Sequence, residues 1–242
     1  MLIGLLSDPH SNLPALEAVL DDVGRVTPDT LVCLGDFVGY GAQPNEVVAA
    51  LKDRCEVCLA GNHDLAALGG LDLATFNQVA AAAVAWTAEH LHQETRAFLG
   101  ALSSRGELAG MELAHASLRD PVREYVIDGY VAAKNFSYHP FLVAAVGHTH
   151  IPALYLLEDK RVVDRRPAAG SPAATGGARV LMNPGAVGQP RDWDPRASWA
   201  TWDTERLVFS LRRVEYPIEE SRAAIMTAGL PQVLGDRLRS GW

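Results

Sequence analysis

Short apolar runs alternate with amphipathic stretches along the first 60 residues of the chain. The runs at 2–7, 31–34 and 55–60 have the length of buried strands. Between them, residues 13–23 carry apolar positions at helical spacing, and Pro44 suits the first turn of a second helix. This alternation predicts a βαβαβ unit with parallel strands, whose sites gather at the carboxyl ends of those strands.

The rest of the chain is expected to complete a single domain spanning residues 1–242. Residues 71–102 are rich in alanine and show helical spacing, so they predict helix. Residues 166–178 are rich in Pro, Gly, Ala and Ser and predict a surface loop, and a helical tail is expected from about 217. Further apolar runs predict strands at 107–114, 122–127, 141–146, 153–158, 161–163, 179–182, 198–202 and 206–214.

The charge of the chain bears on its partners. The formal net charge is −8, from 29 acidic and 21 basic side chains. Proteins that bind nucleic acid along their surface are usually basic, so a nucleic-acid partner is disfavoured. A small anionic substrate can still bind an acidic protein if metal ions concentrate positive charge in one pocket.

Membrane and secretion signals are not found in the sequence. No apolar run approaches ~18 residues, so no membrane span is expected. The first residues lack the basic segment of a signal peptide, and three cysteines do not form a disulfide framework. Cys55 and Cys58 lie in an apolar run with no second pair, which favours buried core cysteines over a zinc site. A cytoplasmic location is therefore expected.

Titratable side chains gather directly after several of the apolar runs. Asp36 follows the run at 31–34, and an unpaired charge buried there would cost several kcal/mol. It must therefore be paired, hydrogen-bonded or bound to a metal. Imidazoles, carboxylates and a carboxamide oxygen suit divalent metal ions. The residues in these positions are Asp8, His10, Asp36, Asn62, His63, His115, His148 and His150.

These residues belong to a set of short motifs in a fixed order: DxH at 8–10, Gly35-Asp36, GNHD at 61–64, His115, and GHTH at 147–150. The ordered set resembles the calcineurin-like metallophosphoesterases. Residues 183–192 (NPGAVGQPRD) resemble a signature of the small prokaryotic phosphodiesterase branch of that family. The resemblance implies an α/β fold in which two packed mixed β-sheets are flanked by helices, an αββα sandwich.

The resemblance also implies a role for each motif residue. Two divalent metal ions are expected, with manganese first and Fe, Zn, Ni or Co as alternatives. A hydroxide shared by the metals attacks phosphorus in line, and His63 assists the leaving group. Asp64 either orients the His63 imidazole and raises its pKa or caps a helix, and both roles stay open. One metal is assigned to Asp8, His10 and His150, the second to Asn62, His115 and His148, and Asp36 bridges them.

Two departures from the family pattern bear on the site. Pro9 stands where the family usually carries Ile or Thr, and its fixed φ constrains how Asp8 and His10 are presented. After Asp36, the protein-phosphatase and symmetrical dinucleotide-tetraphosphatase branches carry Asp-Arg-Gly, whereas this chain has Gly39-Tyr40. The missing arginine disfavours those branches and favours a phosphodiesterase.

Other side chains are candidates for holding the substrate. Arg191 and Arg119 could supply the guanidinium that suits phosphate oxygens, although most arginines are solvated surface charges. Asn12 and Tyr40 are pocket-lining candidates by position only.

Several alternatives remain open at this stage. A protein-interaction scaffold on the same fold is one, since the retromer scaffold subunit resembles the fold; its discriminating feature is the loss of ligands, which are complete here. A phosphomonoesterase or nuclease of the same family is another. The expected partner is a small phosphoester, and homo-oligomerisation stays open.

Overall fold

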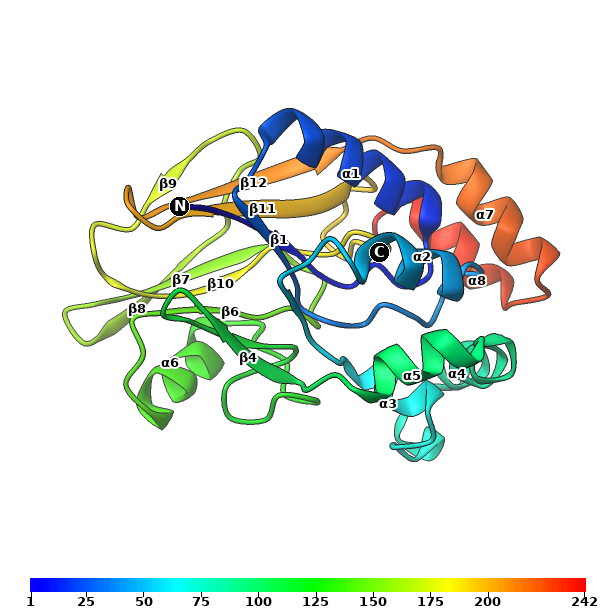
Figure 1. Ribbon diagram of the computed structural model, residues 1–242. Coiled ribbons are helices and arrows are strands. Elements are labelled where there is room, and N and C mark those ends of the chain that lie inside the picture. The colour runs from blue at the N-terminus through cyan, green and yellow to red at the C-terminus, as the bar shows by residue number, and fades with distance from the viewer.

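Two mixed β-sheets of six strands each pack face to face in the computed structural model, which describes residues 1–242, and helices cover their outer faces (Figure 1). The first sheet has the order β3-β2-β1-β11-β12-β9 and the second β4-β5-β6-β10-β7-β8. This arrangement confirms the expected αββα sandwich.

The first sheet is built around β1. This strand pairs in parallel with β2 and antiparallel with β11, so that Leu5 lies between Val32 and Ala200. The antiparallel strands of this sheet come from residues 173–214 and flank a parallel unit from residues 2–58. The strands are β1 (Leu2–Leu6), β2 (Thr30–Cys33), β3 (Val57–Cys58), β9 (Ala173–Ala174), β11 (Ala197–Asp203) and β12 (Val208–Val214).

The second sheet is formed by the middle of the chain. Its strand β6 pairs in parallel with both β5 and β10, and all other pairs are antiparallel. The strands are β4 (Arg105–Leu108), β5 (Met111–Ala114), β6 (Val143–Ala145), β7 (Ala153–Glu158), β8 (Arg161–Arg165) and β10 (Arg179–Asn183).

The helices form separate groups around the sandwich. In Figure 1, α1, α2, α7 and α8 lie with the first sheet, α6 lies below the second, and α3, α4 and α5 project from one end. The bounds are α1 (Leu13–Val26), α2 (Pro44–Leu51), α3 (Asn62–Ala67), α4 (Gln78–His90), α5 (Gln93–Gly100), α6 (Gly129–Tyr138), α7 (Ile218–Thr227) and α8 (Gln232–Asp236), with 3₁₀ turns η1 (Leu73–Thr75) and η2 (Arg237–Arg239). No helix is both long and apolar enough to span a bilayer.

The core follows the two-residue period of the strands. Leu5 points into the layer between the sheets, where it joins Met182 and Trp202. Its neighbour Leu6 points to the opposite face and joins the cluster beneath α1 and α2, which also contains Trp199. Side chains on both faces of the first sheet are therefore buried, which explains why its parallel strands read as continuous apolar runs.

Two predicted elements differ from the structure, and one helix was not predicted. Residues 122–127 form turns and coil instead of a strand; Val126 is buried under α6, while Tyr125 and Ile127 are about half exposed. The following helix α6 was not predicted, although Asp128 accepts a hydrogen bond from the Val131 N–H (2.9 Å) as its N-cap. The predicted helix over 71–102 is interrupted into η1, α4 and α5.

The two edge strands of the first sheet differ from the prediction. The run at 55–60 contributes only the two residues of β3, and the segment 166–178, predicted as a loop, contains β9, which pairs with β12. The loop is otherwise irregular, and the tail beyond 217 is helical, as expected.

Candidate metal centre

The ends of five strands converge at one edge of the sandwich. Asp8 follows β1, Asp36 follows β2 and Asn62 begins α3 just after β3, all at the carboxyl ends of parallel strands. His115 follows β5 and His148 follows β6, which are also parallel to each other. Each sheet therefore presents its own row of ligands, and the packing of the sheets brings the two rows together.

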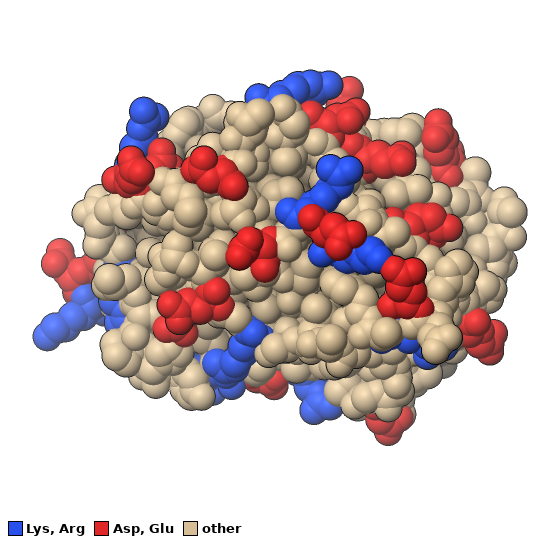
Figure 2. Space-filling model, viewed as in Figure 1, with Lys and Arg blue, Asp and Glu red and all other residues tan.

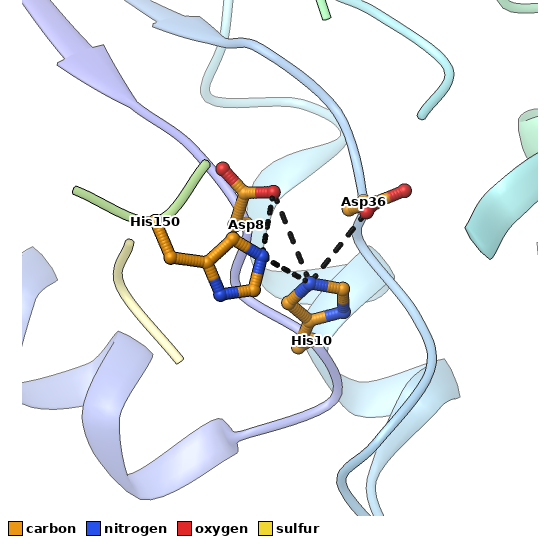
Figure 3. Close-up of side chains that lie close together, drawn as sticks. All are labelled: Asp8, His10, Asp36 and His150. Atoms are coloured by element: carbon orange, nitrogen blue, oxygen red, sulfur yellow. Dashed lines mark hydrogen bonds and ion pairs between the residues drawn. The ribbon is translucent and has the colours of Figure 1, made fainter. Parts of the chain in front are cut away.

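The first cluster contains two imidazoles and two carboxylates (Figure 3). The Nε2 atoms of His10 and His150 lie 3.1 Å apart. Asp8 Oδ1 lies 3.3 Å from His150 Nε2, and Asp36 Oδ2 lies 3.6 Å from His10 Nε2. All four side chains are buried and direct their donor atoms at one point, which is the arrangement that a divalent metal requires.

The second cluster shares Asp36 with the first. Its ligand atoms come from Asp36, His115 and His148, and Asp36 Oδ2 lies 3.4 Å from His115 Nε2. The carboxamide oxygen of Asn62 lies 3.2 Å from the same nitrogen, so Asn62 completes this cluster. Both clusters thus meet at a single carboxylate oxygen, Oδ2 of Asp36.

Hydrogen bonds to the backbone orient three of the imidazoles. His10 Nδ1 lies 2.9 Å from Val38 O, and His115 Nδ1 lies 2.9 Å from Leu34 O. His150 makes the equivalent contact with the Gln189 carbonyl at 2.7 Å. A carbonyl only accepts, so each Nδ1 carries a proton, and Nε2 is the ring nitrogen that faces the cluster, as in metal-binding histidines.

Unpartnered atoms at the centre also fit bound metal ions. Asp8 Oδ1 and His148 Nε2 are buried without a hydrogen-bond partner. Such atoms cost free energy unless something compensates them, and both belong to the clusters. The donors are imidazole nitrogens and carboxylate or carboxamide oxygens with no thiolate, a set that suits Mn, Fe, Zn, Ni or Co.

The protonation of the clusters depends on burial and on Asp36. Burial lowers the pKa of His148 to about 3, so this imidazole is neutral at neutral pH. Burial acts in the same direction on His115, but the Asp36 carboxylate outweighs it and raises the pKa of His115 to about 9. A metal ion at the second cluster therefore has to displace the proton of His115.

The backbone at these turns is in a rarely adopted conformation. Asp8, His10, Asp36, His148 and His150 all have positive φ angles, between 46° and 63°. Non-glycine residues seldom occupy this region, and such strain collects at functional sites because the surrounding fold holds it. Pro9, placed between two of these residues, is compatible with both side chains reaching the first cluster.

Two glycines make the close packing possible. A Cβ on Gly61 would lie 2.0 Å from Asp36 Oδ1, and the Gly61 backbone passes directly against that carboxylate. Gly39 has a φ of 90°, and a Cβ there would lie 2.4 Å from His63 Nδ1. Any larger residue at either position would displace Asp36 or His63.

His63 lies next to the first cluster without being part of it. Its ring centroid is 4.9 Å from that of His10, and its backbone N–H donates to Asp36 Oδ1 at 2.8 Å. The Nδ1 atom has no hydrogen-bond partner, and burial lowers the pKa of the imidazole to about 4.

Asp64 does not orient the imidazole of His63. Its Oδ1 accepts the Val38 N–H at 3.1 Å and its Oδ2 accepts the Gly61 N–H at 2.9 Å. The carboxylate therefore ties the turn after β2 to the start of α3. Of the two predicted roles, the geometry supports helix capping, because Asp64 occupies the first turn of α3 and both its oxygens bind backbone.

Arg191 and Tyr40 lie at the edge of the first cluster. The backbone N–H of Arg191 donates to the His150 carbonyl at 3.2 Å, and the Arg191 guanidinium lies 5.5 Å from the Tyr40 ring centroid. The Tyr40 ring is 4.6 Å from that of His10 and 4.4 Å from that of His63. Arg191 Nη2 binds the Gln189 side chain at 2.9 Å, while Nε has no partner. Both residues are thus within reach of a substrate.

The structure places the other two substrate-binding candidates elsewhere. Arg119 forms an ion pair with Glu124 at 3.1 Å and lines a separate cavity beside α6. Asn12 is the N-cap of α1: its Oδ1 accepts from Ala15 N and Ser221 Oγ, and its Nδ2 donates to the Gly188 carbonyl. All its polar atoms are engaged, so Asn12 has a structural role.

Residues outside the motifs also face the centre. A pocket of about 300 Å³ adjoins Asn62, His63 and His148, and Phe76 and Tyr125 belong to its walls. Neither was predicted, because Phe76 lies in a segment that reads as helix and Tyr125 in a run that reads as a strand. A signal that could have drawn attention to Tyr125 is its position shortly after His115, in the segment that leaves a ligand-bearing strand.

Charges on the outer surface are mixed. Figure 2 shows acidic and basic side chains interspersed over one face, without a broad field of either sign. Most charged pairs there are exposed and contribute little to stability.

The sequence and the fold both match known proteins. Residues 1–207 match the family described as the calcineurin-like phosphoesterase superfamily domain. An uncharacterized protein of Methanocaldococcus jannaschii is 36% identical over 245 residues, covering 99% of this chain and 98% of its own length. A crystal structure of a metallophosphoesterase from Sphaerobacter thermophilus is 38% identical, with a TM-score of 0.91 over 100% of this chain and 99% of that one.

A more distant match agrees on the fold. A hypothetical protein from Pyrococcus horikoshii OT3 has a TM-score of 0.82 at 19% identity, covering 100% of this chain and 98% of that one. The sandwich and its strand order are therefore retained where most of the sequence has changed.

Proposed function

Because the chain belongs to the calcineurin-like phosphoesterase superfamily, we propose that it hydrolyses small phosphodiesters with two divalent metal ions. The observation that carries this proposal is the position of Asp36, whose Oδ2 is shared by two buried ligand clusters. Two metal ions sharing a carboxylate is the arrangement used by many phosphoester hydrolases. Manganese is the first metal to test, followed by Fe, Zn, Ni and Co.

The proposed ligand sets follow the two clusters. Asp8, His10 and His150 would hold one ion, and Asn62, His115 and His148 the other, with Asp36 common to both. When bound, the ions would supply an activated water and a positive field for the phosphoryl oxygens. The protein keeps the ligands in place through the carbonyl contacts at Nδ1 of His10, His115 and His150.

Two further side chains are proposed to act on the substrate. His63 is buried beside the first cluster and would donate a hydrogen bond to the leaving oxygen. Arg191 would bind a phosphoryl oxygen with its guanidinium; it lies in the segment that follows β10, and its backbone N–H is held by the His150 carbonyl.

The preference for diesters rests on the residues after Asp36. At this place Gly39 and Tyr40 present no cation: the Gly39 backbone packs against His63, and the Tyr40 ring packs against His10 and His63. A phosphomonoester carries one more negative charge than a diester and gains more from a second guanidinium. The absence of a guanidinium directly after Asp36 therefore favours the diester.

The test compares two chromogenic substrates with the protein reconstituted with Mn²⁺. We expect hydrolysis of bis-p-nitrophenyl phosphate that exceeds hydrolysis of p-nitrophenyl phosphate and is abolished by a chelator. Fe²⁺, Zn²⁺, Ni²⁺ and Co²⁺ are assayed in parallel. Turnover of neither substrate with any of these metals would contradict the proposal, and a higher rate on the monoester would contradict the diester preference.

A further inference from the structure

The pocket beside the second cluster has walls that lie outside both sheets. One wall is the segment 71–80, which contains η1 and the start of α4, and the other is the loop at 122–125. The side that faces the two ligand clusters is formed by Asn62, His63 and His148, so a group in the pocket lies directly against the proposed metal centre. Its volume of about 300 Å³ is in the range of small-molecule sites.

Aromatic rings surround this space. The Tyr125 ring lies 3.9 Å from that of His148 at an interplanar angle of 31°, and Tyr125 is still 47% exposed. The Phe76 ring lies 5.3 Å from that of His63 in an edge-on arrangement, and the Tyr40 ring lies 4.4 Å from the same imidazole. A flat ring bound here would find aromatic surface on several sides.

The rim of the pocket provides hydrogen-bond donors and no carboxylate. The Arg123 guanidinium has no hydrogen bond or ion pair, and only its backbone N–H is engaged, by Asp120. Asn77 uses its Oδ1 to cap α4, which leaves its amide N–H₂ free. This polar rim does not suit an alkyl chain, whereas a nucleobase has acceptor atoms at its edge and an apolar face.

We propose that this pocket binds the base of a nucleoside whose phosphoester group lies at the two ligand clusters, so that the substrates are nucleotide phosphodiesters. The assignment rests on the proposed function for the position of the phosphate. Tyr125 and Phe76 would contact the faces of the base, and Arg123 and Asn77 its edge. Stacking on aromatic side chains tolerates any base, so we expect little discrimination among the four.

The experiment measures binding instead of turnover. Adenosine 5′-monophosphate, ribose 5-phosphate and inorganic phosphate are titrated into the Mn²⁺-loaded protein by calorimetry. The first two differ only in the base, so the ratio of their dissociation constants measures how much the base contributes to binding. We expect the nucleotide to bind roughly tenfold more tightly than ribose 5-phosphate, from the value of one aromatic stacking contact.

Variants of the wall test the assignment of that ratio. Tyr125→Ala should bring the affinity for the nucleotide to within about twofold of that for ribose 5-phosphate. Inorganic phosphate is titrated into the same variant, so that any effect on the clusters of removing the ring beside His148 is measured separately. Tyr138→Ala is the matched control, since Tyr138 is similarly exposed at 54% but lies on α6, beside another cavity. Arg123→Ala is a second wall variant, with a smaller loss of nucleotide affinity expected.

The outcomes separate this inference from the proposed function. Equal affinity for the nucleotide and ribose 5-phosphate, or a nucleotide preference that Tyr125→Ala and Arg123→Ala both leave intact, would overturn the nucleoside pocket. The proposed hydrolysis of phosphodiesters would not be contradicted by that result, because bis-p-nitrophenyl phosphate tests it separately. Conversely, a base-dependent affinity in a protein that hydrolyses no phosphoester would support the pocket while contradicting the enzyme.

Discussion

The two ligand clusters form the floor of the candidate active site, and the segments 71–80 and 122–125 form its walls. The floor and the walls are built in different ways. On the floor, imidazoles are fixed by backbone carbonyls and the turns adopt strained left-handed backbone, as at His10 and His150. On the walls, Tyr125 is half exposed and Arg123 has no side-chain partner. The sheets therefore position the residues for the chemistry, whereas segments outside the sheets determine which substrate the site accepts.

The largest effect is expected when the atom shared by the two clusters is changed. Asp36→Asn keeps an oxygen for the His63 N–H but weakens the shared ligand, so both metals should be held less well. We expect activity to fall by ~10³-fold or more, at least about 4 kcal/mol in the barrier. Metal content measured by atomic emission should fall in parallel, whereas Asp120→Asn should change neither. Full metal occupancy with full activity would contradict the bridging role.

A change beside the clusters should separate metal binding from chemistry. His63→Ala removes the proposed donor to the leaving oxygen, and kcat should fall ~10²- to 10⁴-fold with metal content unchanged. The control is His92→Ala, because His92 is an exposed histidine at the start of α5. If metal content fell as much as the rate did, His63 would belong to the floor as a structural residue.

Metal addition should stabilise the floor more than the walls. Mn²⁺ at ~100 times its dissociation constant should raise the free energy of unfolding by about 2.7 kcal/mol per site. Melting temperatures with Mn²⁺ and with a chelator test the overall effect, and hydrogen exchange locates it. Amides of the turns at His115 and His148 should gain protection, and those of the loop 122–125 should gain less. Equal protection of both regions would contradict the difference between a metal-stabilised floor and independent walls.

The smallest effects are expected from the two arginines. Arg191→Ala should lower kcat/KM roughly tenfold, since one charge-assisted hydrogen bond to the phosphate would be lost. Arg119→Ala should change it less than about twofold, because that guanidinium is paired with Glu124 away from the clusters. Steady-state kinetics with bis-p-nitrophenyl phosphate compare the two variants. The reverse order of effects would show that substrate enters from the side of α6.

The sequence predicts strands where the apolar or alternating pattern is long. Strands β7 and β12 are recognised because long apolar or alternating runs leave one interpretation. The failures lie where tertiary contacts override local pattern. Val126 is apolar because it anchors a loop beneath α6, and β3 and β9 have two residues each because only part of each segment reaches a partner strand.

The clustering of titratable residues could be predicted, because strand ends leave such side chains few places to go. The roles of their neighbours could not, since they depend on distances between segments far apart in sequence. Asp64 binds the Val38 N–H, and Asn12 is engaged by Ser221 more than two hundred residues away. Neither contact leaves a trace in local sequence. Left-handed φ angles at Asp8 and Asp36 are equally invisible, because neither residue is a glycine.

The position of β11 has a consequence for how the protein is made. This strand pairs antiparallel with β1, matching Leu2 with Asp203, so β1 is synthesised long before one of its two partner strands. All the proposed ligands up to His150 also leave the ribosome before β11 does. Until then one side of β1 is unpaired, and the first sheet closes only after β11 has been made. The first sheet is thus completed late, although the residues at its strand ends are translated early.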